Sequence, residues 1–155
     1  DASTTALNIA LQIKTRYNLT VVTNSLPVAM ELLDAPGITI LLPAGFLRKE
    51  SASLVGMPAL DTLRDYNLQK AFFSAKGFTP TEGLTEVSEA EAAIKRDLLA
   101  KCKDLYAVVD SSKLGQASFA SFAPAHRITQ LITDHYASPQ LVETIRAAGI
   151  NLIIA

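Results

Sequence analysis

The chain has 155 residues, of which 49% are apolar and 19% are charged, and its formal net charge is -1. This length and apolar content predict one domain around a single hydrophobic core. The near-neutral charge, with basic residues spread along the chain, argues against a nucleic-acid surface on this segment and gives no reason to expect membrane binding. The single cysteine, Cys102, rules out an internal disulfide and favours a cytoplasmic location.

Serine caps and apolar runs alternate through the first half of the chain. A serine just before a periodic apolar segment is a common helix N-cap, and a continuous apolar run predicts a buried strand. In chain order, the expected elements are a helix from a Ser3 cap to about Ile13, a strand at 19–24, a helix from a Ser25 cap to about Leu33, a strand at 38–43, a loop at 44–51 and a helix near 53–65.

The same alternation continues in the second half. In chain order, we expect a strand at 70–75, a loop from 76 to 87, a helix from a Ser88 cap to about Cys102, a strand at 105–110, half strand and half turn at 128–134, a helix from Ser138 that Gly149 ends, and a strand at 151–155. Doubly buried strands alternating with helices predict an α/β domain with a mostly parallel sheet and helices on both faces. With no internal linker, residues 1–155 are expected to form one domain.

Polar residues follow the expected strands, at the carboxyl edge where open α/β sheets bind ligands. Helix N-termini and hydroxyls donate hydrogen bonds to phosphate, and Lys and Arg add charge. The clusters are Ser3, Thr4 and Thr5; Thr23, Asn24 and Ser25; Gly45, Arg48, Lys49 and Glu50; Ser74, Lys76 and Gly77; and Asp110, Ser112 and Lys113. Ser, Thr and Asn at a helix start are usually only caps, so each cluster alone is weak evidence, but their convergence at one edge indicates a small, hydroxyl-rich, phosphorylated ligand.

Other chemistry has little support in the sequence. Lys95 and Arg96 could be solvated helix surface as readily as ligand contacts. His126 and His135 lack Cys or carboxylate partners at metal-ligand spacing, so no metal site is expected. We find no P-loop, G-x-G-x-x-G, G-x-S-x-G or H-E-x-x-H motif, and we expect no cofactor.

Seven segments occur in an order that resembles a known family. They are TVVTNSLPVAMEL, RKESASLVG, KAFFSAKGFTPTEGLTE, EAAIKRDLL, VVDSSKLGQASF, LITD and AGINLIIA. Together they resemble the C-terminal effector-binding domain of DeoR-family transcriptional repressors over essentially the whole chain. The resemblance implies a bacterial regulator of sugar metabolism whose operator DNA is bound by an N-terminal winged helix-turn-helix absent from this chain. It also implies a phosphorylated sugar or related metabolite as effector, and a homo-oligomer.

The same domain is similar in fold to ribose-5-phosphate isomerase, and the comparison bears on catalysis. The isomerases carry an Asp-Gly-Ala-Asp pattern where this chain has Ser74-Ala75-Lys76-Gly77, so the acid/base carboxylates are missing there. Moving a proton between sugar carbons needs a positioned base. We therefore expect a binding domain with no catalytic residue. A second alternative is a sugar-phosphate isomerase or deaminase in which Glu86 acts as the base. A third alternative is an oligomerisation module with a vestigial pocket.

The resemblance and the clusters together suggest a role for each candidate residue. Ser3, Thr4 and Thr5 would hold a phosphate, Thr23, Asn24 and Ser25 would add donors, and Lys95 and Lys113 would supply charge. Ser74, Lys76, Glu86 and Asp110 are expected to contact ligand hydroxyls or to order the surrounding loops. Further candidate ligand-binding residues are Gly45, Arg48, Gly77 and Thr85. Ser3 stands where the family usually has glycine, and His126 where a small hydroxyl residue is usual, so the sugar itself stays open.

Overall fold

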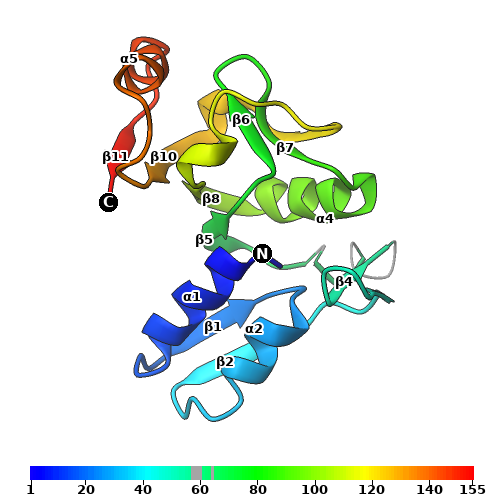
Figure 1. Cartoon of the computed structure of the whole chain (residues 1–155). Helices are drawn as coiled ribbons and strands as arrows, with labels where there is room; N and C mark the ends of the chain where they lie inside the picture. Colours follow the sequence, from blue (N-terminus) through cyan, green and yellow to red (C-terminus); the bar gives the residue numbers. More distant parts are fainter. Residues whose placement is uncertain (57–60, 64) are drawn as a thin grey trace. The chain divides into compact units, whose positions relative to one another are not determined.

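The structure is a computed structural model that describes residues 1–56, 61–63 and 65–155. It separates into two compact units, Asp1–Tyr66 and Asn67–Ala155, which are described one at a time (Figure 1). The expectation that residues 1–155 form one domain stays a prediction.

The first unit begins with two helices and two parallel strands. Its elements are α1 (Thr4–Ile13), β1 (Leu19–Val22), α2 (Leu26–Glu31) and β2 (Ile38–Leu41), and β1 pairs with β2 in parallel. The helices bury small and branched side chains, including Ala10, Val28 and Leu32, against apolar residues of both strands. The predicted serine caps are confirmed, because the hydroxyls of Ser3 and Ser25 accept hydrogen bonds from first-turn amides.

The second part of this unit corrects the sequence prediction. In place of a loop at 44–51 and a helix from 53, the chain forms an antiparallel hairpin of β3 (Phe46–Arg48) and β4 (Ser53–Val55). The amide of Leu54 donates to the carbonyl of Asn24, so contacts with a distant turn decide the conformation over the local pattern. Residues 61–63 are helical, and residues 57–60 and 64 of the predicted helix lie outside the described residues.

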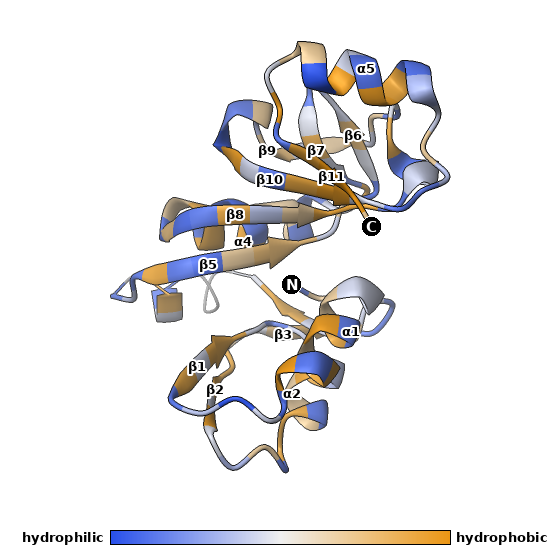
Figure 2. Cartoon of the chain, turned by 90° about the vertical axis from the view of Figure 1, so that its left-hand side faces the viewer, coloured by the Kyte–Doolittle hydropathy of each residue, from blue (hydrophilic) through white to orange (hydrophobic). Residues whose placement is uncertain are grey.

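The second unit is built on a four-stranded parallel sheet. The strands are β5 (Leu68–Phe73), β8 (Cys102–Val108), β10 (Ile128–Thr133) and β11 (Leu152–Ile154), in the order β11-β10-β8-β5. Two helices accompany the sheet, α4 (Glu89–Ala100) and α5 (Pro139–Ala147). Residues 128–133 are strand throughout, which corrects the half-turn expected there. The predicted α/β class with a mostly parallel sheet is confirmed, and Figure 2 shows how hydrophobic residues dominate β11.

A small antiparallel sheet lies in the same unit and also corrects the prediction. It contains β6 (Gly77–Thr79), β7 (Gly83–Glu86) and β9 (Ala120–Ala123), in the order β6-β7-β9. Residues 76–87 were expected to be a loop because they are rich in Gly, Pro and Thr. Gly83 adopts a φ of +70°, which lets the chain turn tightly into β7. Short 3₁₀ turns occur at Ser111–Lys113 and Ala125–Arg127.

One face of the parallel sheet carries the core of the second unit. The sheet register aligns Phe73 with Ala107 and Ala107 with Leu131, so these three side chains point to the same face. The ring of Phe73 packs edge-on against Phe122 of β9, with ring centroids 5.9 Å apart. Helix α4 buries Leu98 and neighbouring apolar residues against the same elements. Among the described residues, no helix is both long enough and apolar enough to span a membrane.

Candidate functional site

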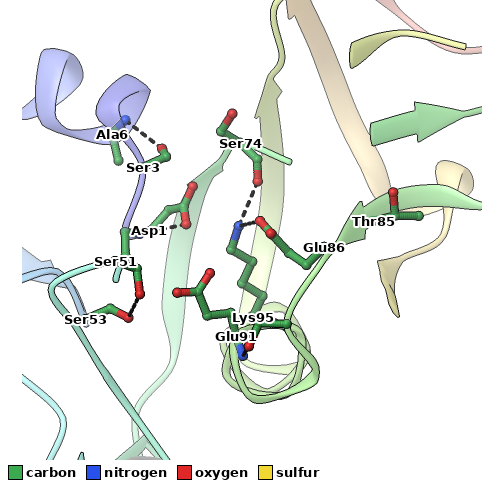
Figure 3. Close-up of polar contacts among 12 residues, drawn as sticks. Asp1, Ser3, Ala6, Ser51, Ser53, Ser74, Thr85, Glu86, Glu91 and Lys95 are labelled. Carbon is green, nitrogen blue, oxygen red and sulfur yellow. Dashed lines mark hydrogen bonds and ion pairs between the residues drawn. The ribbon is translucent and has the colours of Figure 1, made fainter. Parts of the chain in front are cut away.

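A buried ion pair lies where β5, β7 and α4 meet. Glu86 is the last residue of β7 and Lys95 is in the middle of α4, and their side chains approach to 2.5 Å between Oε1 and Nζ. Lys95 also donates to the main-chain carbonyl of Ser74, just past β5, at 2.8 Å (Figure 3). The ring of Phe122 lies 4.8 Å from Nζ. Glu86 and Lys95 are 3% and 5% exposed, so the pair is shielded from water.

The surroundings of Lys95 act on the pKa of its side chain in two opposite directions. Burial lowers the pKa of its ammonium, and the charges of Glu86 and Glu91 oppose that shift. The ammonium is therefore held by its carboxylate partners and by the Ser74 carbonyl. The interpretation of Lys95 as solvated surface is wrong. Arg96 next to it is surface-exposed and forms an ion pair with Glu89 at 2.8 Å.

Two buried polar atoms have no hydrogen-bond partner among the described residues. One is Oε2 of Glu86, the oxygen that does not face Lys95, and the other is the hydroxyl oxygen of Thr133. Thr133 is the last residue of β10 and is 3% exposed. Buried polar groups are normally paired, and an unpaired one indicates a bound water, an ion or a ligand. Both atoms lie at the carboxyl ends of strands.

The turn after β8 is held by two aspartates. Asp110 accepts from the amide of Ser112 at 3.2 Å, from the hydroxyl of Ser112, and from Lys113 Nζ at 2.6 Å. Burial alone would raise the pKa of Asp110, but the hydrogen bonds from Lys113 and Ser112 outweigh it and lower that pKa. Asp134, which follows β10, accepts from the amides of Ser111 and Tyr136 at 2.9 Å each. Lys113 is therefore the cation of a partly exposed turn, paired with Asp110.

Three further candidates hold the β6–β7 hairpin together. The hydroxyl of Thr85 donates to the carbonyl of Gly77 at 3.0 Å and accepts from the amide of Ser118 at 2.8 Å. A Cβ on Gly77 would lie 2.4 Å from the carbonyl oxygen of Gln116, so no larger residue fits there. Lys76 donates its amide to Thr85 at 2.9 Å and exposes its side chain. These contacts give Thr85 and Gly77 a structural role.

In the turn after β1, each of the three polar side chains forms a hydrogen bond with a main-chain group of the same unit. The hydroxyl of Thr23 accepts from the amide of Ser25 at 3.1 Å, and the amide side chain of Asn24 donates to the carbonyl of Leu54 at 3.2 Å. The hydroxyl of Ser25 accepts from Val28 at 3.3 Å. All three polar residues are buried. Their side chains thus anchor the start of α2 to β4, and a ligand role for them stays a prediction.

The remaining candidate residues of the first unit contact residues that are close to them in the sequence or in the same hairpin. Ser3 accepts from the amide of Ala6 at 3.0 Å, and Thr4 and Thr5 form the first turn of α1, whose amides the helix itself leaves unpaired (Figure 3). Arg48 donates to the Ser51 hydroxyl at 3.1 Å within the hairpin. A Cβ on Gly45 would lie 2.8 Å from the carbonyl oxygen of Val55, which explains that glycine by close backbone approach.

The structure brings some of the candidates together within one unit. Ser74, Glu86 and Lys95 share one contact network, and Asp110 with Lys113 forms a second one in the turn after β8, the strand next to β5. Sequence reasoning missed Thr133 and Phe122. Both come from strands that were wholly or partly unrecognised, and a correct strand assignment through residue 133 would have pointed to Thr133.

Other features of the described chain give weaker support for a functional site. Residues 1–56, 61–63 and 65–155 contain no group of three His, Cys, Asp or Glu side chains that could hold a metal ion. Cys102 is buried, and burial raises the pKa of its thiol. A hollow of about 490 Å³ lies at the amino ends of β1 and β2, lined by residues such as Tyr17, Asn18 and Pro36. This hollow is at the opposite end of β1 from the capped start of α2, and none of the candidate residues lines it.

A parallel sheet with buried polar groups at its carboxyl edge is typical of α/β domains that bind small molecules. Residues 1–135 match the family model described as the DeoR C terminal sensor domain. The chain belongs to this family, and the predicted resemblance is confirmed.

Curated relatives agree with this assignment. The chain is 37% identical over 155 residues to the HTH-type transcriptional regulator GolR of Listeria innocua, covering 100% of this chain and 61% of that protein. It is 33% identical to the HTH-type transcriptional repressor GlcR of Bacillus subtilis, covering 99% of this chain and 59% of that protein. The chain therefore spans about three fifths of the length of these regulators. Among solved structures, the decarboxylase AibA/AibB is similar with a TM-score of 0.48 at 14% identity, covering 100% of this chain and 86% of that one.

Proposed function

We propose that this chain is the effector-binding domain of a cytoplasmic DeoR-type repressor of sugar metabolism, and that its effector is a phosphorylated sugar or a related metabolite. Operator DNA would be bound by a helix-turn-helix segment of the full-length protein, which acts as a homo-oligomer. The family membership and relatives named as transcriptional regulators and repressors support the proposal. The near-neutral charge of the chain agrees with DNA binding elsewhere in the protein.

The observation that carries the proposal is that two polar networks follow the ends of two adjacent strands, β5 and β8. Strand β5 ends just before Ser74, whose carbonyl binds Lys95 of the Glu86–Lys95 pair, and its neighbour β8 ends just before Asp110 and Lys113. A phosphate would bind the partly exposed Lys113 in a charge-assisted hydrogen bond, in competition with Asp110. In the first unit, described by itself, the first-turn amides of α1 are donors of the kind that bind phosphate, and a ligand role for Ser3, Thr4 and Thr5 stays a prediction.

The same network favours binding over turnover. One oxygen of Glu86 is engaged by Lys95, and the carboxylate is fixed between β7 and α4. A proton-abstracting base must reach the reacting carbon of a bound sugar, and a second carboxylate would be expected to complete the acid/base pair. Glu91, the nearest other buried carboxylate, is on α4 and contributes charge to Lys95. A sensor alters operator affinity only if its ligand prefers one arrangement of the full protein.

A thermal-shift screen tests the proposal. The parent chain, Lys113→Ala and the control Lys103→Ala, which removes an exposed lysine of β8, are each heated with sugar phosphates at millimolar concentration. We expect at least one compound to stabilise the parent chain, by about 2.7 kcal/mol at a hundred times its Kd. Lys113→Ala should lose most of that gain, and Lys103→Ala should keep it.

Two results would contradict the proposed function. If every sugar phosphate leaves the melting temperature unchanged, the oligomerisation module with a vestigial pocket is favoured. If ribose 5-phosphate or an aminosugar phosphate is turned over and Glu86→Gln abolishes that turnover, the chain is an enzyme.

A further inference from the structure

The unpaired oxygens of Glu86 and Thr133 lie on the same side of the parallel sheet. Thr133 is two residues beyond Leu131, so it shares the face of Leu131, Ala107 and Phe73. On that face Phe73 packs against Phe122, and the Phe122 ring lies 4.8 Å from the Lys95 ammonium that pairs with Glu86. The register and these contacts therefore place both unpaired atoms at one edge of one face.

Their spacing suits one small ligand. Strand β5 leads to the Ser74 carbonyl that binds Lys95, the partner of Glu86, and β5 is separated from β10 by β8 alone. Two strand spacings correspond to roughly 10 Å. One sugar-sized molecule spans that distance.

We propose that Glu86 and Thr133 form the polyol end of the effector site, where Glu86 Oε2 accepts a hydrogen bond from a ligand hydroxyl and the Thr133 hydroxyl binds a second one. The proposal rests on the proposed function and deepens it, because it assigns an orientation. The hydroxyl-bearing carbons face Glu86, and the phosphate lies away from it.

Charge decides this orientation. A carboxylate oxygen is an acceptor only, so its partner must be a donor such as a hydroxyl. A phosphate at this position would meet the negative charge of Glu86 in a water-poor environment, where like charges repel strongly. Lys95 cannot serve a phosphate there without leaving Glu86, to which it is bound at 2.5 Å. The hydroxyl of Thr133 both donates and accepts, so it discriminates less than Glu86.

The first experiment uses Thr133→Val, which keeps the shape of the side chain and removes its hydroxyl. Because that hydroxyl has no partner among the described residues, the free variant should melt at the same temperature as the parent or higher. Calorimetry with glucose, galactose and ribose and with glucose 6-phosphate, galactose 6-phosphate and ribose 5-phosphate measures binding. We expect about three- to tenfold weaker binding for the variant. Thr144→Val, the same change at an exposed position of α5, is the matched control and should bind as the parent does.

The second experiment removes the acceptor charge. Glu86→Gln should weaken binding of the same sugars about ten- to a hundredfold, because a hydrogen bond to a charged group is lost. Glu82→Gln, an exposed carboxylate just before β7, is the control. If Glu86→Gln fails to fold with Lys95 uncompensated, the double variant Glu86→Gln with Lys95→Met removes both charges and keeps the test available.

Each outcome decides between the two proposals. Tight binding of the phosphates with unchanged affinity in Thr133→Val and in the Glu86 variants overturns the polyol end and leaves the proposed function intact. Equal binding of the neutral sugars and their phosphates, lost in those variants, supports the polyol end and overturns the phosphate preference. Absence of binding by all six compounds to the parent chain overturns both.

Discussion

The turn after β1 in the first unit and the carboxyl edge of the sheet in the second unit look alike in sequence, but they differ in how their polar groups are satisfied. In the first, the side chains of Thr23, Asn24 and Ser25 all bind main-chain groups of their own unit. In the second, Glu86 Oε2 and the Thr133 hydroxyl are buried without a partner among the described residues.

This difference separates structural polar residues from candidate binding residues. A buried polar group that is fully paired contributes to the fold and has little left to offer a ligand. A buried polar group that is unpaired raises the free energy of the empty protein, and a ligand that pairs it recovers that energy on binding. Composition alone does not show the difference, because hydroxyl side chains occur in both regions.

The largest effect should come from breaking the buried ion pair. Lys95→Met leaves Glu86 buried without its cation and should lower the free energy of unfolding by about 3–5 kcal/mol. The double variant Glu86→Gln with Lys95→Met should recover most of that loss, because neither charge is then left alone. Urea unfolding measures both. Lys103→Met, on the exposed side of β8, should change stability by less than about 0.5 kcal/mol.

A single variant as stable as the parent would show that water reaches the pair. The contrast with the turn after β1 would then weaken, because Glu86 Oε2 would have a solvent partner in place of a ligand.

A smaller effect is expected in the turn after β1. Ser25→Ala removes the cap of α2 and should cost about 1 kcal/mol of stability. We expect no change in affinity for sugar phosphates, because the Ser25 side chain is fixed at the start of α2, where it caps the helix. Urea unfolding and calorimetry check the two halves of this prediction, and Ser25→Thr, which retains the cap, is the control. Loss of affinity in Ser25→Ala would assign this turn to the binding site as well.

The smallest effect concerns acid pH and the turns beside β8 and β10. Hydrogen bonds from the Ser111 and Tyr136 amides lower the pKa of Asp134 from its ordinary 3.8. A lowered pKa in the folded state means that the stabilisation is present above pH 3.8 and is lost as the pH falls through the lowered value.

Amide NMR signals of Ser111 and Tyr136 should therefore shift only well into the acid range. Asp134→Asn should remove this transition, and the exposed Asp34→Asn should leave it in place. A transition at the usual aspartate pKa would show that these hydrogen bonds are not formed in solution.

Helix boundaries were predictable from the sequence because they depend on neighbours. The hydroxyls of Ser3, Ser25, Ser88 and Ser138 all accept from an amide three residues on, as a cap does. Gly149 has a φ of +78°, the conformation that ends a helix at this position.

The short antiparallel strands were not predictable because distant residues hold them. The hydroxyl of Thr85 binds Ser118, and Asn24 binds Leu54, at separations of 33 and 30 residues. The local sequence of residues 44–51, and of the Gly- and Thr-rich residues 76–87, therefore predicts loops. The network at Glu86 was partly predictable. Glu86 and Lys95 were both candidate residues, but the burial that pairs them follows from the missed β7–β9 pairing.

The contact between Lys95 and residue 74 has an evolutionary consequence. The ammonium binds the main-chain oxygen of Ser74, which every amino acid carries. A substitution at this buried position by another small side chain can therefore preserve the anchor. Among related sensors, divergence at this position combined with an invariant lysine would mark a retained contact, which a comparison of side-chain identities alone would overlook.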